Sequence, residues 1–232
     1  MRIGTLLKVD VRFQYRHYLY HAYFIISILY ILLLLSIPPD TKEQTAIFLL
    51  FSDCSFLGSF FIGGIILLEK DQGVYDSLFV TPVRTSEYIW SKVTALGILS
   101  IAASLLIFIS VFGISLKLFP LLVGVAFNSI FASLLGLIFA VRVRSINQYL
   151  MISPLFVTIF FLPVLEVLGM MELKFFYLLP GKAGLLLMEG AFNSLTPYQW
   201  MYAVSLLFIY ILVAYRLAYN AFYTHIKLRI GG

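Results

Sequence analysis

Apolar runs without a charged residue for about 20 positions recur along this chain. A helix of about 20 apolar residues spans the hydrocarbon core of a bilayer, because its backbone hydrogen bonds are satisfied internally. A soluble protein with a large core does not fit, since only 12% of the residues are charged, about half the usual share. Transmembrane β-barrels alternate in segments of about ten residues, and these runs do not. The sequence therefore predicts an all-α integral membrane protein forming one transmembrane domain, residues 1–232.

The lengths of the runs, and the prolines and charges that end them, predict six membrane spans. The spans are Leu19–Ile37, Thr45–Leu68, Val93–Leu116, Leu121–Val141, Tyr149–Met170 and Tyr198–Leu217. We expect Pro154 and Pro163 to bend the fifth span. Residues 171–197 are interrupted by Pro180-Gly181-Lys182. We predict a re-entrant or interfacial helical hairpin there, on the outer face.

The distribution of Lys and Arg predicts the orientation. If the N-terminus is inside, 12 of these residues lie on the cytoplasmic side and 4 on the other side. The four outer ones are Lys42, Lys117, Lys174 and Lys182. Cytoplasmic loops carry the excess of positive charge, so we expect both termini and residues 69–92 to be cytoplasmic. The prediction is a multi-pass protein of the plasma (inner) membrane.

Residues 5–18 precede the first span and carry a basic stripe. Lys8, Arg12 and Arg16 recur every four residues, and Leu6 and Val9 fall on the neighbouring face. Such a helix lies flat among the headgroups, with its cations on anionic lipid phosphates. We predict an interfacial helix in contact with membrane lipids; the alternative is a plain polar extension of the first span.

Motifs for bond chemistry are missing from the sequence. The pair Gly181-Lys182 resembles a phosphate loop, but Phe176 replaces the required glycine and Ala183 the required Ser or Thr. No H-E-x-x-H, C-x-x-C or G-x-S-x-G pattern occurs. The basic residues lie at the ends of apolar segments, where they set topology. We therefore predict no catalytic residue, no metal site, no cofactor held by this chain and no nucleic-acid partner.

The polar segment Glu69–Lys92 separates the second and third predicted spans and carries seven of the 27 charged side chains. It is long for a connection between two membrane helices. Val74–Val80 can form a short helix that ends before Pro82, which lacks a backbone donor. Thr85 or Ser86 can then cap the helix that continues into the third span. We predict a rigid helical unit that a partner contacts; the alternative is an ordinary solvated loop.

The string EKDQGVYDSLFVTPVRTSEYIWSK resembles the cytoplasmic segment of ABC type-2 exporter permeases. In that family an acidic–basic pair closes the second span, a glycine and a Leu-x-x-x-Pro stretch follow, and a lysine opens the third span. The matching positions here are Glu69, Lys70, Gly73, Leu78, Pro82 and Lys92. More loosely, the N-terminal string LLKVDVRFQYRHYLYHAYF and the chain length are similar to permeases of fluoroquinolone or multidrug exporters.

That resemblance implies a partner and a mode of action. A separate ABC ATPase subunit, which binds ATP and Mg²⁺, would dock on the cytoplasmic face. The segment Gly73–Pro82 would be the coupling helix seated on it. A second permease, identical or not, would complete a dimer. The chain would then be a half-transporter that moves a hydrophobic or amphipathic substrate (a drug, a lipid-like molecule or a peptide) outward without hydrolysing ATP itself.

Asp53 is the one acidic residue well inside a predicted span. An ionisable group at that depth is expensive and normally faces protein or water. We predict a substrate path that includes Asp53, Phe56, Phe60 and Asn128. The structural alternatives are a carboxyl group that fastens its helix to a neighbour such as Asn128, and phenylalanines that face lipid or core. In a rival function, an ion gradient drives a secondary transporter or channel through Asp53. A membrane-embedded enzyme or scaffold is a third reading, without a supporting motif.

Small residues recur every four positions on two spans. The stripes are Ser55, Ser59 and Gly63 on the second span and Gly124, Asn128, Ala132, Gly136 and Ala140 on the fourth. Such stripes let helices approach closely. They predict tight packing either within the chain or between two permeases.

Overall fold

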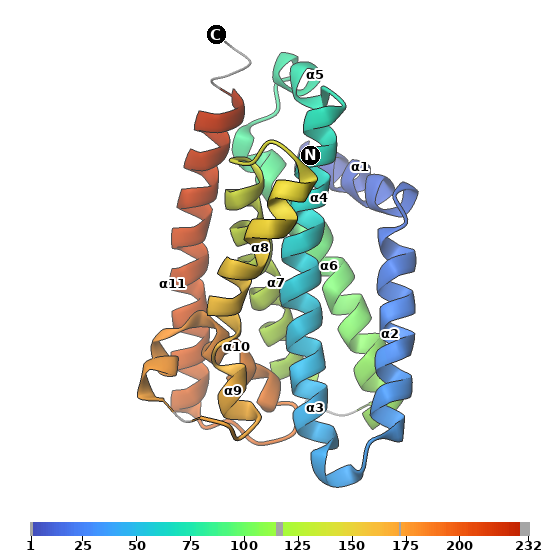
Figure 1. The fold of residues 1–232 in the computed structure, drawn as a ribbon, viewed down its shortest axis with the longest axis vertical. Coiled ribbons are helices and arrows are strands. Elements are labelled where there is room, and N and C mark those ends of the chain that lie inside the picture. Colours follow the sequence, from blue (N-terminus) through green and yellow to red (C-terminus); the bar gives the residue numbers. More distant parts are fainter. Residues whose placement is uncertain (1, 115–117, 172, 228–232) are drawn as a thin grey trace.

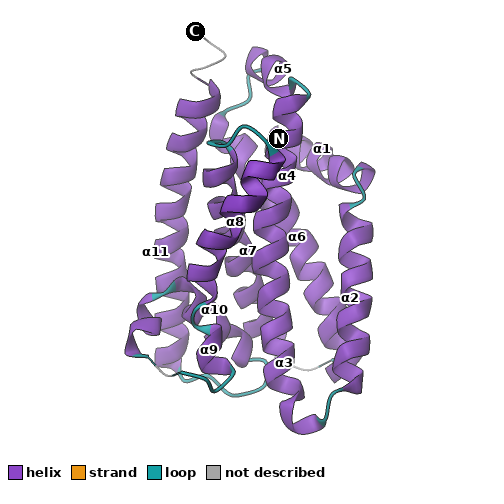
Figure 2. Ribbon diagram, in the orientation of Figure 1, coloured by secondary structure: helices purple, strands orange, loops and turns teal. Residues whose placement is uncertain are grey.

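The computed structural model describes residues 2–114, 118–171 and 173–227. Within these ranges the chain forms helices and loops and no strand (Figure 2). The elements are α1 (Arg2–Arg16), α2 (Leu19–Ser36), α3 (Pro39–Ser52), the π-helical η1 (Asp53–Leu57), α4 (Gly58–Asp71), α5 (Val74–Val80), α6 (Thr85–Phe112), α7 (Leu118–Ala140), α8 (Ile146–Phe161), α9 (Val164–Val167), the 3₁₀ turn η2 (Lys174–Leu178), α10 (Pro180–Glu189), α11 (Pro197–Phe222) and η3 (Tyr223–Lys227).

Five helical stretches of the described chain are long and apolar enough to cross a membrane. They are Leu19–Ser36, Pro39–Asp71, Thr85–Phe112, Leu118–Ala140 and Pro197–Ile226. Each corresponds to one predicted span. On the outer helices α2 and α11, large apolar side chains such as Leu32 and Leu212 are exposed, as a lipid-facing surface requires. The predicted all-helical architecture is confirmed. The five stretches support a multi-pass membrane protein.

The fifth predicted span differs from the structure. Residues Tyr149–Met170 do not form one helix, because α8 ends at Phe161 and only the short α9 follows. Pro163 has no backbone N–H to continue the α8 ladder, and Gly169 turns the chain with φ +68°. At 16 residues, α8 is shorter than the roughly 20 residues of a standard span. The six-span arrangement is therefore not confirmed.

The third predicted span also has different ends. Helix α6 begins at Thr85, eight residues before the predicted Val93. The N-cap is Arg84, and not Thr85 or Ser86 as we predicted. The N–H of Arg84 donates to the Glu87 carboxylate at 2.8 Å, and this cap starts the helix at Thr85. The helix ends at Gly113, where φ is +77°; the predicted end, Leu116, lies outside the described residues. The polar segment therefore contributes the first turns of α6.

Helix α7 is the centre of the bundle and contacts α4, α6, α10 and α11 (Figure 1). Helix α2 packs on α6 at the edge of the bundle, and α1 lies across one end of it. The short α5 projects at that same end, which we call the α5 end, and the C-terminal turns of α11 also lie there (Figure 1). Helix α9 lies at the opposite end.

The predicted small-residue stripes pack against each other within one chain. A Cβ on Gly136 of α7 would lie 2.6 Å from the carbonyl oxygen of Ser59 on α4. A Cβ on Gly63 would lie 2.2 Å from the ring of Tyr149 on α8, whose hydroxyl donates to the Ser59 carbonyl at 2.7 Å. Because the hydrophobic effect does not drive helix association in lipid, packing depends on close van der Waals contact. Glycine allows that contact by letting the backbones approach.

Residues 171–197 contain η2 and α10, and α10 lies inside the bundle. Its residues from Pro180 to Met188 are buried, and it packs on α7 and α11. A Cβ on Gly184 would lie 2.2 Å from Oδ1 of Asn128. The Lys182 ammonium pairs with Glu166 at 2.8 Å, so the positive charge of this buried lysine is balanced by a carboxylate. Helix α10 therefore enters the bundle from the end opposite α5.

We predict that Gly136→Ala destabilises the protein, because the new methyl group meets both Cγ2 of the β-branched Ile62 and the backbone of Ser59. Overpacking of this kind costs about 1–3 kcal/mol. The matched control is Gly97→Ala on α6, where a Cβ meets no atom within 4 Å. Thermal unfolding midpoints in one detergent measure both. Equal midpoints for the two variants would contradict the close approach of α4 and α7.

Candidate functional site

A buried ammonium group joins three helices at the α5 end. The Nζ of Lys92 on α6 lies 2.9 Å from Oδ1 of Asp10 on α1 and 2.5 Å from Oε1 of Glu69 on α4. Lys92 is only 2% exposed. Since a buried charge without a partner is very costly, these two carboxylates are what makes a lysine tolerable here. We call Asp10, Glu69, Lys92, Tyr75 and Tyr88 the Lys92 cluster.

Two tyrosines connect this ion pair to α5. The hydroxyl of Tyr88 donates to Oε2 of Glu69 at 2.5 Å. The hydroxyl of Tyr75, on α5, lies 3.1 Å from that of Tyr88 and donates to the Ile66 carbonyl on α4 at 3.1 Å. Burial, helped by the Glu69 carboxylate, raises the pKa of Tyr75, so its hydroxyl stays protonated at physiological pH. Helix α5 is thus attached to α4 by a buried hydrogen bond from Tyr75, and to α6 by the contact between the Tyr75 and Tyr88 hydroxyls.

The Lys92 cluster carries two carboxylates and one ammonium group, and further cations lie beside it. A cavity of about 360 Å³ adjoins Asp10 and Glu69 and is lined on its α1 side by Arg12 and Arg16. These groups offset the surplus negative charge. A buried ion pair is weak evidence for stability, because desolvation can exceed the attraction. Its effect here is to fix α1, α4 and α6 in one arrangement.

The outer surface of α5 is open. Gly73 precedes the helix with φ +65°, a left-handed conformation that glycine adopts without strain. Val80, at the C-terminal end of α5, is 87% exposed. Leu78 is half-buried and packs against the core, whereas Pro82 is exposed. A short helix with a buried anchor and an exposed apolar tip has the form of a docking element.

The structure divides the six predicted coupling residues into two groups. Glu69 and Lys92 form the buried ion pair, and Lys70 donates to the Val143 carbonyl at 3.1 Å. These three hold the base of α5 in the bundle. Gly73, Leu78 and Pro82 shape α5 itself.

Sequence reasoning missed Asp10, Tyr75, Tyr88 and Ser91. Asp10 is the single acid among the bases of α1, and the Ser91 hydroxyl also donates to its carboxylate. That isolated acid was a usable signal for an ion pair. Tyr75 and Tyr88 carried no such signal in the sequence, because the distance between them depends on how α5 folds back onto α4.

Asp53 stands at the start of η1, where the helix is π-wound. It is 1% exposed, and neither of its carboxylate oxygens has a hydrogen-bond partner among the described residues. The side-chain amide of Asn128, on α7, is likewise buried and without such a partner within the described ranges. The structural alternative, a hydrogen bond between Asp53 and Asn128, does not form. π-Helical turns inside α-helices frequently mark functional sites.

The groups around Asp53 are polar for a bundle interior. Tyr23 and Tyr30 of α2 lie within electrostatic reach of its carboxylate. The hydroxyl of Tyr23 lies 3.2 Å from that of Ser100, which in turn accepts from Ser129 on α7 at 3.2 Å. This chain of hydroxyls crosses three helices. Asp53 therefore faces protein rather than lipid.

The predicted phenylalanines follow Asp53 along the same helical stretch, toward the α5 end (Figure 1). The rings of Phe56 and Phe60 stack with centroids 6.0 Å apart, and Phe56 also contacts Phe161 at 4.6 Å. Both are half-buried. A separate apolar cavity of about 270 Å³ lies between α7, α8 and α11, with Phe139 and Phe156 among its lining residues. The bundle thus offers apolar surfaces at two places.

Comparison with known proteins agrees with this architecture. The sequence model of the Fluoroquinolones export permease protein family matches residues 1–229. Two relatives are fluoroquinolones export permease proteins of Mycobacterium tuberculosis, from strains CDC 1551 / Oshkosh and ATCC 25618 / H37Rv. Each is 27% identical over 206 residues, which cover 88% of this chain and 87% of the relative.

We predict that Lys92→Met destabilises the protein by about 3–5 kcal/mol, because it leaves two buried carboxylates without their cation. The control is the triple variant Lys92→Met, Glu69→Gln, Asp10→Asn, which removes every charge of the ion pair at similar volume. It should lose less stability than Lys92→Met alone. Unfolding midpoints in detergent compare the two, and a triple variant less stable than the single one would rule out this electrostatic account.

Proposed function

The chain belongs to the fluoroquinolones export permease family, and from that membership we propose that it is the transmembrane subunit of an ATP-driven ABC exporter. The family supports a multi-pass membrane permease for export. Hydrolysis of ATP, with Mg²⁺, is assigned to a separate ATPase chain. Two permeases and two such ATPases form the working unit in this proposal, so the chain is a half-transporter.

One observation carries the proposal: α5 is anchored by buried groups and exposed at its tip. Tyr75 ties α5 to the Ile66 carbonyl, whereas Val80 projects with 87% of its surface exposed. A short projecting helix with an anchored base and an exposed tip matches the coupling helix that the resemblance of residues 69–92 implies. We assign α5 as the coupling helix and the α5 end as the cytoplasmic face of the inner membrane. The excess of Lys and Arg predicted for that side supports the assignment.

The Lys92 cluster explains how a push on α5 reaches the bundle. Tyr75 transmits displacement to α4 through Ile66 and to α6 through Tyr88. Asp10 extends the connection to α1 through Lys92. Because these groups are packed and hydrogen-bonded, the ends of the three helices move as one unit. ATP binding in the partner would in this way switch the permease between inward- and outward-facing arrangements.

For the substrate path we assign Asp53, Asn128, Phe56 and Phe60. The two polar side chains are buried and lack hydrogen-bond partners in the described chain, so they can bind a polar or cationic group of an amphipathic molecule. The rings of Phe56 and Phe60, which follow Asp53 in the sequence and stack on each other, would supply apolar contact. The proposed substrate class is a hydrophobic or amphipathic drug.

We predict that Val80→Asp weakens the ATPase complex by about tenfold or more, since losing one central apolar contact costs at least about 1.4 kcal/mol. The control is Ile114→Asp, which changes an apolar side chain of similar exposure, 84%, beyond the opposite end of α6. Each tagged variant is purified from its native membrane in mild detergent, and the co-purified ATP hydrolysis is measured. Equal loss in both variants, or no ATPase with the wild type, would refute α5 as the docking element.

A second function, transport driven by an ion gradient, is favoured by one observation, the unpartnered buried carboxylate of Asp53. The two functions differ in energy source. Inverted native vesicles, incubated with an external fluorescent fluoroquinolone, distinguish them when ATP is supplied with and without an ionophore. Accumulation that persists with the ionophore supports the ATP-driven exporter. Accumulation that follows the gradient and ignores ATP supports the alternative.

We predict that Asp53→Asn lowers accumulation of a cationic amphipathic drug in these vesicles by about tenfold, because a hydrogen bond to a charged group is worth roughly 1.5–3 kcal/mol. The control is Asp40→Asn, which removes an exposed carboxylate in the first turn of α3. It should leave accumulation within about twofold. Unchanged transport in Asp53→Asn would remove Asp53 from the path.

A further inference from the structure

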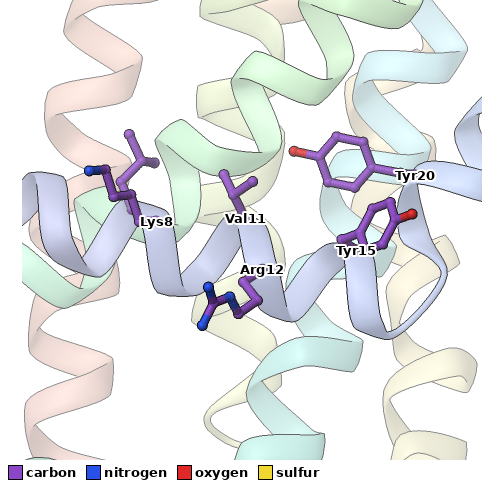
Figure 3. Close-up of a pocket in the computed structure, with 6 residues that line it drawn as sticks. Lys8, Val11, Arg12, Tyr15 and Tyr20 are labelled. Atoms are coloured by element: carbon purple, nitrogen blue, oxygen red, sulfur yellow. The ribbon is translucent and has the colours of Figure 1, made fainter.

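An open groove of about 450 Å³ lies in the angle between α1 and α2 (Figure 3). Helix α1 contributes Leu7, Lys8, Val11, Arg12 and Tyr15, and α2 contributes Tyr20. In Figure 3 the ring of Tyr20 points from α2 toward Val11 of α1. The Tyr15 and Tyr20 rings lie near each other, with centroids 6.3 Å apart. The cavity thus has mostly apolar and aromatic walls, and both of its charged lining residues are cations.

A second, narrower cavity of about 150 Å³ continues along the bundle between α2 and α6. Its lining is almost entirely apolar and includes Phe24, Leu99, Ala102 and Leu106. Tyr20 lines both cavities, so they adjoin at that residue. Because α1 lies across the end of the bundle and α2 runs along it (Figure 1), the pair leads from the membrane surface into the depth of the hydrocarbon.

We propose that this angle binds one anionic phospholipid from the leaflet at the α5 end. Its phosphate would pair with Lys8 and Arg12, and one acyl chain would follow the α2–α6 cavity past Ala102. The cavity with Lys8 and Arg12 matches a negatively charged headgroup, and the apolar α2–α6 cavity matches an acyl chain. A soluble anion would leave the channel unused, and an uncharged lipid would not offset the positive charge of Lys8 and Arg12, although Arg12 also lines the cavity beside Asp10 and Glu69.

The bound lipid would hold α1 from the side opposite to the Lys92 cluster. Asp10 and its contacts with Lys92 and Ser91 fix one face of α1 to α6. Lys8 and Val11 lie on the cavity side. Lipid composition would therefore bear on the packing of the α5 end, whichever energy source drives transport.

The test is retention of phosphatidylglycerol by the purified full chain, measured by native mass spectrometry against phosphatidylcholine of the same acyl chains. We expect one phosphatidylglycerol per chain to survive delipidation. Lys8→Gln and Arg12→Gln should each weaken retention about fivefold, the effect of one cation near an anionic lipid surface. The matched control, Arg16→Gln, removes a cation of the same helix that does not line this cavity, and should change retention less than about twofold.

A second variant tests the channel without altering charge. Ala102 is exposed in the α2–α6 cavity, so Ala102→Phe fills the path of the acyl chain. It should reduce retention as strongly as Lys8→Gln at an unchanged unfolding midpoint. Equal losses in Arg16→Gln and Lys8→Gln would mean diffuse surface attraction and would overturn the site. Retention of phosphatidylcholine equal to that of phosphatidylglycerol would also overturn the site, and full retention of phosphatidylglycerol by Ala102→Phe would do the same.

Discussion

Lys92 is buried and held by two carboxylates from two other helices, and the arrangement of the α5 end depends on that contact. Asp10 brings α1 to α6, and Glu69 brings α4 to the same point. Tyr88 and Tyr75 extend the network to α5. In a low-dielectric setting each of these groups needs its partners, so the helices can separate only at high cost. This gives a short surface helix a firm connection to the membrane-embedded part of the protein.

Glycine residues allow the helices of the bundle to approach one another closely. Gly136 and Gly63 admit the backbone of α4 and the ring of Tyr149, and Gly184 admits the amide of Asn128. Hydrophobic burial drives little association in lipid, so van der Waals contact at close approach has to supply it. Helix α7 is central because its small residues face α4 on one side and α10 on another.

Asp53 contrasts with Lys92. Both are buried ionisable groups, but Lys92 has two ion-pair partners whereas Asp53 has no hydrogen-bond partner in the described chain. A satisfied group of this kind fixes structure. An unsatisfied one, set at a π-helical turn, remains available to a ligand, a proton or a water molecule. In the proposed exporter, the Lys92 cluster would transmit movement from α5 and Asp53 would contact the substrate.

The sequence by itself determined the all-helical membrane fold, the start of α2 at Leu19, the short helix Val74–Val80 and the family resemblance carried by residues 69–92. Each depends on local hydrophobicity or on proline and glycine, whose effects act over a few residues. Only the tertiary structure decided that α8 is short, that α10 enters the bundle and that Glu69 and Lys92 pair with each other and with Asp10. Those features depend on which helix faces meet. Contacts between residues as far apart as Asp10 and Lys92 leave no periodic trace in the sequence, so local patterns could not reveal them.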